Sequence, residues 1–421
     1  MKFYSLFVLL LIISGVCRAT DYYVSATGSN SNNGTSASTP WQTLSKVETV
    51  CNAGTIQPGD RILFKKGDAF TGSIIIGSIW GKNANSGTAA NPITFGSYGT
   101  GAKPVFLYPV SSTASVTNRI TMKFVGVDYW IFDGLNFTDL DITNDKITPA
   151  NCGMALYFGA ETEATNNHCT IQNVDISLCG MGIVLIGDFN KVTGCNLTNF
   201  KNLKSTNGGD DDYGANALTI ISGDDNEISN NYISGAWSAS LDYGWNGGAC
   251  EIFNSCHRNK MMYNTIYDCG GVSEFGAYES NATANDNMFA YNKIINCGTL
   301  TWCNISGNFA IQVSNNQYFN NVIIENNASR FSGPNTGMGL TAQYQALISP
   351  ESLLFAYNGS PTAPAVFNLK NNVLNLTTGI DVVRSNDPKT THTNNIYKLS
   401  GGSVANTTLG STELSTAAAI F

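Results

Sequence analysis

The sequence contains little charge and very few basic side chains. Only 12% of its 421 residues are Asp, Glu, Lys or Arg, and just 3 are His. The 30 acids outnumber the 22 Lys and Arg, which gives a formal net charge of -8 and no basic cluster. Nucleic acids and anionic membrane surfaces are therefore excluded as the main partners. The polar residues are mostly Asn, Ser, Thr and Gly, which favours a turn-rich all-β protein over a helical bundle.

Long hydrophobic runs are also missing, apart from one at the N-terminus. This run extends from Leu6 to Val16, follows Lys2 and ends shortly before the small residue Ala19. It is too short to cross a bilayer, so it predicts a cleaved signal peptide over residues 1–19 and a secreted protein, extracellular or periplasmic. Cys17 leaves a lipoprotein signal as an alternative, although Val16 is a poor residue to precede a lipidated cysteine.

Ten of the 11 cysteines follow the predicted signal peptide. An even number outside the cytoplasm permits disulfides, but their pairing cannot be read from the sequence. The Cys and His residues lack zinc-finger spacing, and neither a serine nucleophile elbow nor a phosphate-binding loop is present.

A short pattern recurs from residue 169 onward, in which Asn is followed two positions later by an aliphatic residue. The aliphatic positions Ile233, Ile266, Ile294 and Ile323 follow one another at steps of 33, 28 and 29 residues, and Leu374 comes later. Short strands that repeat at such a period predict the coils of a solenoid, because one coil alone cannot bury its apolar side.

Two further columns keep the same register. Seven residues before the aliphatic positions Ile176, Leu197, Ile233, Ile266 and Ile294 stand Cys169, Asn190, Asn226, Asn259 and Asn287. Eight residues before them, Asp225, Arg258 and Asp286 alternate in charge. Asparagine tolerates the left-handed turn conformation and can bond to the same amide one coil above, so both columns predict parallel coils in register.

On these repeats the chain resembles the pectate-lyase-like superfamily of secreted bacterial proteins. The stretch from Asp21-Tyr-Tyr-Val to Phe64-Lys-Lys-Gly67 is similar to the opening of such proteins, and the resemblance covers most of residues 21–400. It implies an all-β, single-stranded right-handed parallel β-helix with an N-terminal cap. Such folds carry lyases, hydrolases, epimerases and non-catalytic adhesins, so the function must be argued from the site.

The expected organisation follows from these patterns. Residues 20–110 form an N-terminal cap and the first coils, with a short amphipathic helix over residues 43–52 and a strand over 61–64. Residues 111–400 form the repeats. Residues 401–421 form a Ser/Thr/Gly/Ala-rich tail that ends on apolar residues. This ending leaves open the alternative that the sequence is truncated.

The repeat register predicts a pair of acids. Glu251 stands 15 residues before Ile266, and Glu279 stands 15 residues before Ile294, so we expect them on adjacent coils about 4.8 Å apart. Such a pair suits retaining glycoside hydrolysis. Alternatively it holds Ca²⁺ that neutralises a uronate during β-elimination, or it is a solvated pair without a function.

Other candidates surround this pair in the sequence. Asp242, Glu274 and His257 are second-tier catalytic candidates, each with a role in a turn as the alternative. The predicted substrate-binding residues are Trp237, Tyr243, Trp245, Tyr278 and Gln312. The acids Asp210, Asp211 and Asp212 form a candidate calcium loop or a solvated acidic turn.

The sequence thus predicts a secreted protein, a monomer, that cleaves an extracellular polysaccharide on the outer face of a β-helix. Glycoside hydrolysis is favoured because carboxylates outnumber positioned bases. A calcium-dependent polysaccharide lyase acting on uronates is the first alternative. A non-catalytic glycan-binding surface or matrix protein is the second, since it would share the fold and the aromatic side chains.

Overall fold

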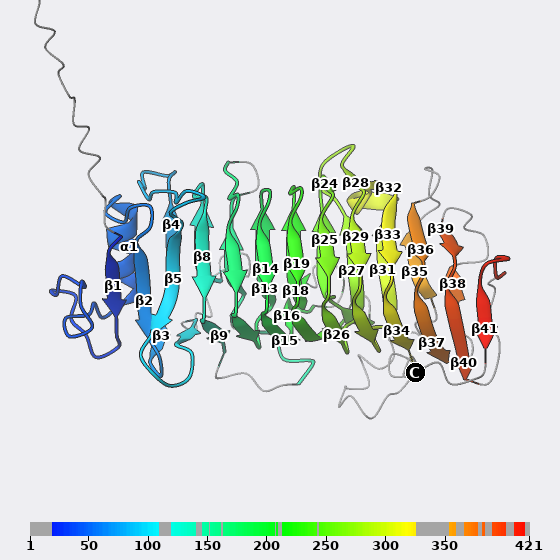
Figure 1. Cartoon of the computed structure of the whole chain (residues 1–421), viewed down its shortest axis with the longest axis horizontal. Coiled ribbons are helices and arrows are strands. Elements are labelled where there is room, and N and C mark those ends of the chain that lie inside the picture. Colours follow the sequence, from blue (N-terminus) through cyan, green and yellow to red (C-terminus); the bar gives the residue numbers. More distant parts are fainter. Residues whose placement is uncertain are drawn as a thin grey trace, which may run out of the picture.

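Three long parallel sheets, named A, B and C, form the molecule in the computed structural model (Figure 1). The structure describes residues 19–108, 119–139, 145–150, 152–160, 163–206, 208, 213–241, 244–325, 353–358, 366–377, 381–383, 390–400 and 408–416. The chain visits sheets A, B and C in turn, and each coil pairs in parallel with the coils before and after it. The predicted right-handed parallel β-helix is confirmed.

The strands are short, and each sheet takes one strand from nearly every coil. Sheet A contains β1 (Asp21–Val24), β2 (Arg61–Lys65), β5 (Ile93–Tyr98), β8 (Trp130–Asp133), β11 (Thr170–Gln172), β14 (Lys191–Thr193), β19 (Glu227–Ser229), β25 (Lys260–Met262), β29 (Met288–Ala290), β33 (Asn316–Phe319), β36 (Phe367–Lys370) and β39 (Thr390–Thr393). Sheet B contains β3 (Ala69–Thr71), β6 (Val105–Leu107), β9 (Asn136–Thr138), β12 (Asp175–Ser177), β15 (Asn196–Phe200), β20 (Tyr232–Ala236), β26 (Thr265–Tyr267), β30 (Lys293–Ile295), β34 (Val322–Glu325), β37 (Val373–Thr377), β40 (Ile396–Ser400) and β41 (Leu414–Thr416). Sheet C contains β4 (Ile74–Gly77), β7 (Ile120–Val125), β10 (Met154–Phe158), β13 (Met181–Ile186), β18 (Asn216–Ile221), β23 (Cys250–Phe253), β27 (Gly271–Gly276), β31 (Thr299–Asn304), β35 (Leu353–Asn358) and β38 (Asp381–Val383).

Several short elements lie outside the three long sheets. Two antiparallel hairpins project from it, β16 (Asn202–Lys204) with β17 (Tyr213–Gly214) and β21 (Ser238–Ser240) with β22 (Gly244–Asn246). Three further strands, β24 (Cys256–His257), β28 (Thr283–Asn285) and β32 (Gln312–Ser314), form a short parallel sheet. A 3-10 turn, η2, spans Gly307–Phe309.

The core runs along the inside of the coils. The aliphatic column predicted from the sequence is confirmed, since Ile233, Ile266, Ile294 and Ile323 are direct register partners in sheet B. These side chains are buried within one continuous apolar cluster. Side chains alternate between the two faces of each strand, so the residues between the core positions form the outer surface.

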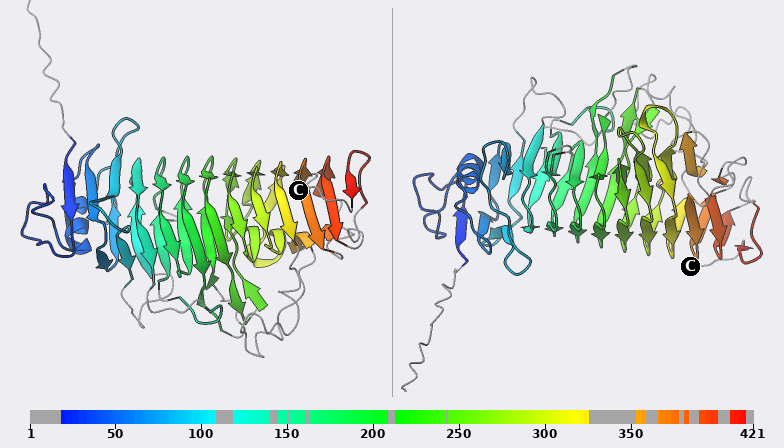
Figure 2. Two further views of the ribbon diagram at one scale, coloured as in Figure 1. Left: turned by 60° about the horizontal axis from the view of Figure 1, so that its bottom comes forward. Right: turned by 90° about the horizontal axis from the view of Figure 1, so that it is seen from above.

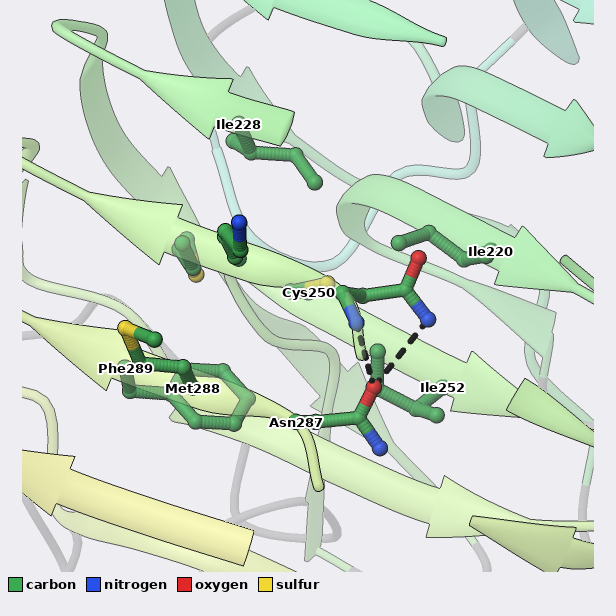
Figure 3. A pocket seen from close by; sticks show the side chains of 10 residues that line it. Ile220, Ile228, Cys250, Ile252, Asn287, Met288 and Phe289 are labelled. Atoms are coloured by element: carbon green, nitrogen blue, oxygen red, sulfur yellow. Dashed lines mark hydrogen bonds between the residues drawn. The ribbon is translucent and has the colours of Figure 1, made fainter. Parts of the chain in front are cut away.

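Two ladders of buried asparagines join the coils at the bends. One contains Asn190, Asn226, Asn259, Asn287 and Asn316, and the other contains Asn231, Asn264, Asn292, Asn321, Asn372 and Asn395. In each step the backbone N–H of one asparagine donates to the side-chain oxygen of the next. Figure 3 looks into the interior beside Asn287, whose Oδ1 accepts bonds from the backbone N–H and the Nδ2 of Asn259. The predicted asparagine columns therefore satisfy buried backbone groups that lie outside the strands.

The predicted charge column lies directly before the first ladder. Asp225, Arg258 and Asp286 all have positive φ angles of 56°, 57° and 60°, as expected where the chain turns sharply. Arg258 donates to Asp225 and also to Asp224, at 2.7 to 3.2 Å. Asp286 instead accepts a hydrogen bond from Asn315. In this column of alternating charge, Arg258 therefore pairs with the acids of the preceding coil.

Both ends of the stack carry extra structure (Figure 2). The predicted helix is confirmed as α1 (Leu44–Asn52), which begins after Thr43, whose hydroxyl accepts the backbone N–H of Lys46. Leu44, Val47 and Cys51 of α1 join the core of the coils, so the helix covers the first coil. At the other end β41 pairs with β40, so parallel stacking extends into the segment that the sequence assigned to a tail.

Two features of the described residues bear on earlier expectations. None of their helices is long and apolar enough to cross a membrane. All ten of their cysteines are buried thiols, and none is in a disulfide. The predicted signal peptide, residues 1–19, lies outside the described residues except for Ala19.

Candidate functional site

Two glutamates stand side by side on the outer face of sheet C. Glu251 of β23 and Glu274 of β27 are direct register partners, and both alternate with buried residues of the core. Thr219 of β18 precedes them in the same column, and Trp302 of β31 follows. The two carboxylates therefore project from adjacent coils, whose strands lie about 4.8 Å apart.

This register corrects the predicted pairing of Glu251 with Glu279 on adjacent coils. The partner of Glu251 is Glu274, not Glu279. The error arises because the coil that contains β27 is longer at the bend after sheet C. Cys256 follows Phe253 by 3 residues, whereas the partner of Cys256, Ala284, follows Gly276 by 8. Counting 15 residues back from Ile294 of sheet B therefore reaches Glu279, which lies five residues after the true partner, Glu274.

Glu251 is partly buried and strongly hydrogen-bonded. Its Oε2 accepts bonds from Asn216 Nδ2 at 2.8 Å and from Thr219 Oγ1 at 3.1 Å. Burial raises the pKa of the Glu251 carboxyl above its ordinary value of 4.5, and these two hydrogen bonds oppose that rise. Glu251 thus favours its protonated form more than a solvated glutamate does.

Glu274 has different neighbours. Its Oε1 accepts a bond from Asn304 Nδ2 at 3.2 Å, and the Oδ1 of Asn304 accepts the indole N–H of Trp302 at 3.1 Å. Trp302 thereby orients Asn304, which in turn holds the carboxylate. Asn216 and Thr219 donate to Glu251, whereas Asn304 donates to Glu274, and such different surroundings let two carboxyls adopt different protonation states.

An aromatic cluster borders the acid pair. Phe253 lies two residues beyond Glu251 on the same face of β23, and its ring meets that of Tyr278 edge-on at 4.9 Å. Tyr278 also contacts Phe309 at 5.2 Å, while 69% of the Tyr278 residue remains exposed. Exposed rings beside polar groups are typical of sugar-binding surfaces, because they stack on the apolar faces of sugars.

The structure separates three of the predicted residues from the acid pair. Glu279 is exposed in the turn after β27, and Gln312 is paired with Thr283 in the short sheet that contains β28 and β32. His257 lies in β24 of that same short sheet, where its ring bonds to Asp224 and to Thr283, both at 2.9 Å. These residues line the bend beyond sheet C rather than the face that carries Glu251.

The aromatic candidates near β21 and β22 divide into two groups. Trp237 is only 5% exposed, and Lys146 Nζ lies 5.0 Å from the centre of its ring, so the protein itself covers it. The expectation of a sugar-stacking Trp237 is therefore wrong for this conformation. Trp245 belongs to β22, but its side chain, Asp242, Tyr243 and the acidic run Asp210, Asp211 and Asp212 lie outside the described residues.

The residues that sequence reasoning missed are Asn216, Phe253, Trp302, Asn304 and Phe309. Their signal was present but weak. Aligning Cys250-Glu251-Ile252 with Ser273-Glu274-Phe275 by strand alternation would have placed the two glutamates together. The amide and aromatic residues carry no such pattern, since their roles depend on the side-chain contacts of folded coils.

Calcium fits the acid pair poorly. The groups that reach the two carboxylates include the NH2 groups of Asn216 and Asn304, which donate hydrogen bonds and cannot bind a cation. Calcium takes six to eight oxygen ligands. Within the described ranges no group of three or more His, Cys, Asp or Glu side chains is placed to hold a metal ion.

Fold and acid pair together define a parallel β-helix protein with paired carboxylates on one outer face. No family model matches the chain, and no curated protein matches it. Similar solved structures include a GH136 lacto-N-biosidase from Eubacterium ramulus, with 14% identity over 90% of this chain and 68% of that one and a TM-score of 0.49. Pectate lyase Pel9A has 16% identity over 94% and 80% of the two chains, with a TM-score of 0.45. A mannuronic acid specific polysaccharide family 6 lyase from human gut microbiota has 14% identity over 92% and 88%, also with a TM-score of 0.45. At these identities the likeness concerns the fold alone.

Proposed function

We propose that this protein is a secreted enzyme that cleaves a polysaccharide by glycoside hydrolysis on the outer face of sheet C. The observation that carries the proposal is the direct pairing of Glu251 with Glu274 on adjacent coils. Retaining glycosidases hold two carboxyl groups about 5 to 5.5 Å apart, close to the distance of about 4.8 Å between neighbouring strands.

The environments of the two glutamates suggest their roles. Glu251, whose pKa burial raises, is the proposed general acid that protonates the glycosidic oxygen as the bond to the leaving sugar breaks. Glu274 is the proposed nucleophile, which attacks the anomeric carbon and forms a glycosyl ester. Glu251, then deprotonated, accepts a proton from the water that hydrolyses this ester, which returns both groups to their starting states.

The aromatic cluster supports a carbohydrate substrate. Phe253 lies two residues beyond Glu251 on the same face and contacts Tyr278, and Trp302 lies beyond Glu274, so a sugar above the acids would contact rings on two sides. Proposed secretion rests on the N-terminal run of residues 1–19 and agrees with a large extracellular substrate.

A lyase needs a base that abstracts a proton next to a uronate carboxylate. From Thr219 to Trp302 the ionisable side chains of this column are the two glutamates, whereas Tyr157 and Lys123 of the same column lie two and three coils beyond Thr219. Hydrolysis is therefore the better-supported reaction for this face.

The test is incubation of the purified mature protein with neutral and uronate-containing polysaccharides, with Ca²⁺ or with a chelator. Reducing ends and the absorbance of unsaturated products are followed together. New reducing ends without unsaturation, lost in Glu251→Gln and Glu274→Gln but kept in Glu279→Gln, support the proposal. Unsaturated products would replace it with a lyase, and binding without turnover would replace it with a glycan-binding protein.

A further inference from the structure

Four of the buried cysteines form two pairs across neighbouring coils. Cys152 and Cys179 each stand two residues before a strand of sheet C, namely before Met154 of β10 and Met181 of β13. Cys269 and Cys297 stand in the same relation to β27 and β31. The register of these strands pairs Met154 with Met181 and Gly271 with Thr299, so each cysteine lies one coil from its counterpart.

Backbone hydrogen bonds show that this register holds at the cysteines themselves. The N–H of Gly180 donates to the carbonyl of Cys152 at 3.0 Å, as it does when residues 152 and 179 are neighbours in a parallel ladder. The N–H of Asp268 donates to the carbonyl of Ile295 at 3.0 Å, which places residue 269 beside residue 297.

The thiols of each pair also lie close enough to affect one another. Cys152 together with burial raises the pKa of Cys179, and burial together with Cys269 raises the pKa of Cys297. Parallel neighbours lie about 4.8 Å apart, within the range of about 4.4 to 6.8 Å between Cα atoms that a disulfide spans. Both pairs therefore already have the backbone spacing of a disulfide.

Other buried cysteines differ in this respect. Cys169 and Cys195 stand at the beginning of the two asparagine ladders, where their backbone N–H groups donate to Asn190 and Asn231. Their register neighbours one coil further on are asparagines rather than cysteines. Cys169 and Cys195 therefore serve as controls for disulfide formation between neighbouring coils.

We propose that Cys152 with Cys179, and Cys269 with Cys297, become two disulfides when the protein folds in an oxidising compartment. The inference rests on the secretion that is part of the proposed function. In each reaction two thiols lose two protons and two electrons and form one S–S bond, while a disulfide oxidant such as glutathione disulfide is reduced to two thiols. Each bond closes a loop of about one coil.

Oxidation must precede the final closure of the coils. All four thiols are buried in the folded protein, so a soluble oxidant cannot reach them. Burial also raises the pKa of Cys297, and contact with Cys152 together with burial raises that of Cys179, which suppresses the reactive thiolate. The bonds therefore form in the partly folded chain and remain protected afterwards.

The second pair has a consequence for the acid pair. Cys269 stands five residues before Glu274, and Cys297 stands five residues before Trp302. A disulfide between them would tie together the two coils that supply Glu274, Asn304 and Trp302. It would fix the register on which the hydrogen bond from Asn304 to Glu274 depends.

Peptide mapping tests the inference. The mature chain is produced in a bacterial periplasm and in the cytoplasm of the same host, denatured under alkylating conditions and digested without reduction. We expect crosslinked peptides that join Cys152 to Cys179 and Cys269 to Cys297 in the periplasmic protein alone. Cys169 and Cys195 should be alkylated in both samples.

Variants distinguish the pairing from chance oxidation. Cys179→Ser should leave Cys152 open to alkylation and keep the other crosslink, and Cys297→Ser should do the converse. Complete alkylation of all ten cysteines in the folded periplasmic protein, or crosslinks between other cysteines, would overturn the inference. Mapping does not depend on activity, so inactive protein with both crosslinks refutes only the hydrolase, and active protein without them refutes only the disulfides.

Discussion

Glu251 and Glu274 occupy paired positions on neighbouring parallel strands, with both side chains on the outer face of sheet C. Like charges directly opposite one another destabilise a sheet, so the fold must compensate for this pair. Different side chains stabilise the two carboxyl groups. Two side chains donate to Glu251, whose pKa burial raises, whereas Asn304 donates to Glu274.

The first prediction concerns activity. Glu251→Gln and Glu274→Gln should each lower kcat/KM by about 10²-fold or more on a cleaved polysaccharide, because general acid–base catalysis contributes about 10²- to 10⁴-fold. Glu279→Gln is the matched control, since Glu279 is exposed in the turn after β27 and should leave kcat/KM unchanged. Equal losses in all three variants would contradict the register-based assignment.

A second prediction concerns the pH dependence of stability. Because the pKa of Glu251 is raised in the folded state, the folded protein keeps a proton that the unfolded chain releases above 4.5. The free energy of unfolding should fall as the pH rises from about 4.5 through the folded-state pKa, and Glu251→Gln should lack this fall. Urea unfolding of both proteins between about pH 4 and pH 8 measures the difference. Parallel curves would show that Glu251 does not titrate abnormally.

Tyr278 should act on substrate binding more than on chemistry. Removing its exposed ring in Tyr278→Ala takes away a stacking surface that adjoins Phe253 on the face of Glu251, so KM should rise while kcat changes little. Tyr263→Ala provides the comparison, because Tyr263 is also exposed but stacks on Tyr291 at a bend between sheets A and B. A loss of kcat alone in Tyr278→Ala would argue against a stacking role.

The asparagine ladders should dominate local stability. Asn292 accepts two bonds from Asn264 and donates to Asn321 and to the carbonyl of Met261. Asn292→Ala leaves several buried groups unsatisfied, at about 1 to 3 kcal/mol each, so the free energy of unfolding should fall by about 2 to 5 kcal/mol. The same substitution at exposed Asn83, outside both ladders, should change stability by less than about 0.5 kcal/mol in denaturant titrations.

Glu413 should stabilise the last coils in a pH-dependent way. Burial alone would raise its pKa, but hydrogen bonds from Gly410, Asn395 and His392 outweigh burial and lower it. Its contribution to stability is therefore present above about pH 4.5 and is lost as the pH falls through the lowered folded-state pKa. Thermal unfolding of the wild-type protein and Glu413→Gln should differ at pH 7 and converge in strong acid. A constant difference at all pH values would rule out titration of Glu413 as the cause.

The repeats made the fold predictable from sequence. Ile233, Ile266, Ile294 and Ile323 recur because each coil must place an apolar side chain at the same inward position, and the asparagines recur because each bend leaves the same backbone N–H to be satisfied. Such periodic demands leave periodic residues in the sequence. The helix after Thr43 was equally visible, since its buried residues follow a helical spacing.

The partner of Glu251 was harder to predict, because bends differ in length while strands do not. Five additional residues between Gly276 and Ala284 shift any count made from sheet B, and nothing in the sequence marks where they begin. Trp237 illustrates a second limit. The sequence predicted it as a substrate-binding residue, but Lys146, far away in the sequence, covers its ring.

The asparagine ladder also tolerates large differences in the number of residues between one coil and the next. Asn321 and Asn372 are consecutive members of one ladder although 51 positions separate them, whereas the other steps of this ladder span 23 to 33. The hydrogen bonds of the ladder are the same at all of these lengths. New segments can therefore be inserted at the bends, by evolution or by design, while the spacing of the coils and of any groups displayed on them is preserved.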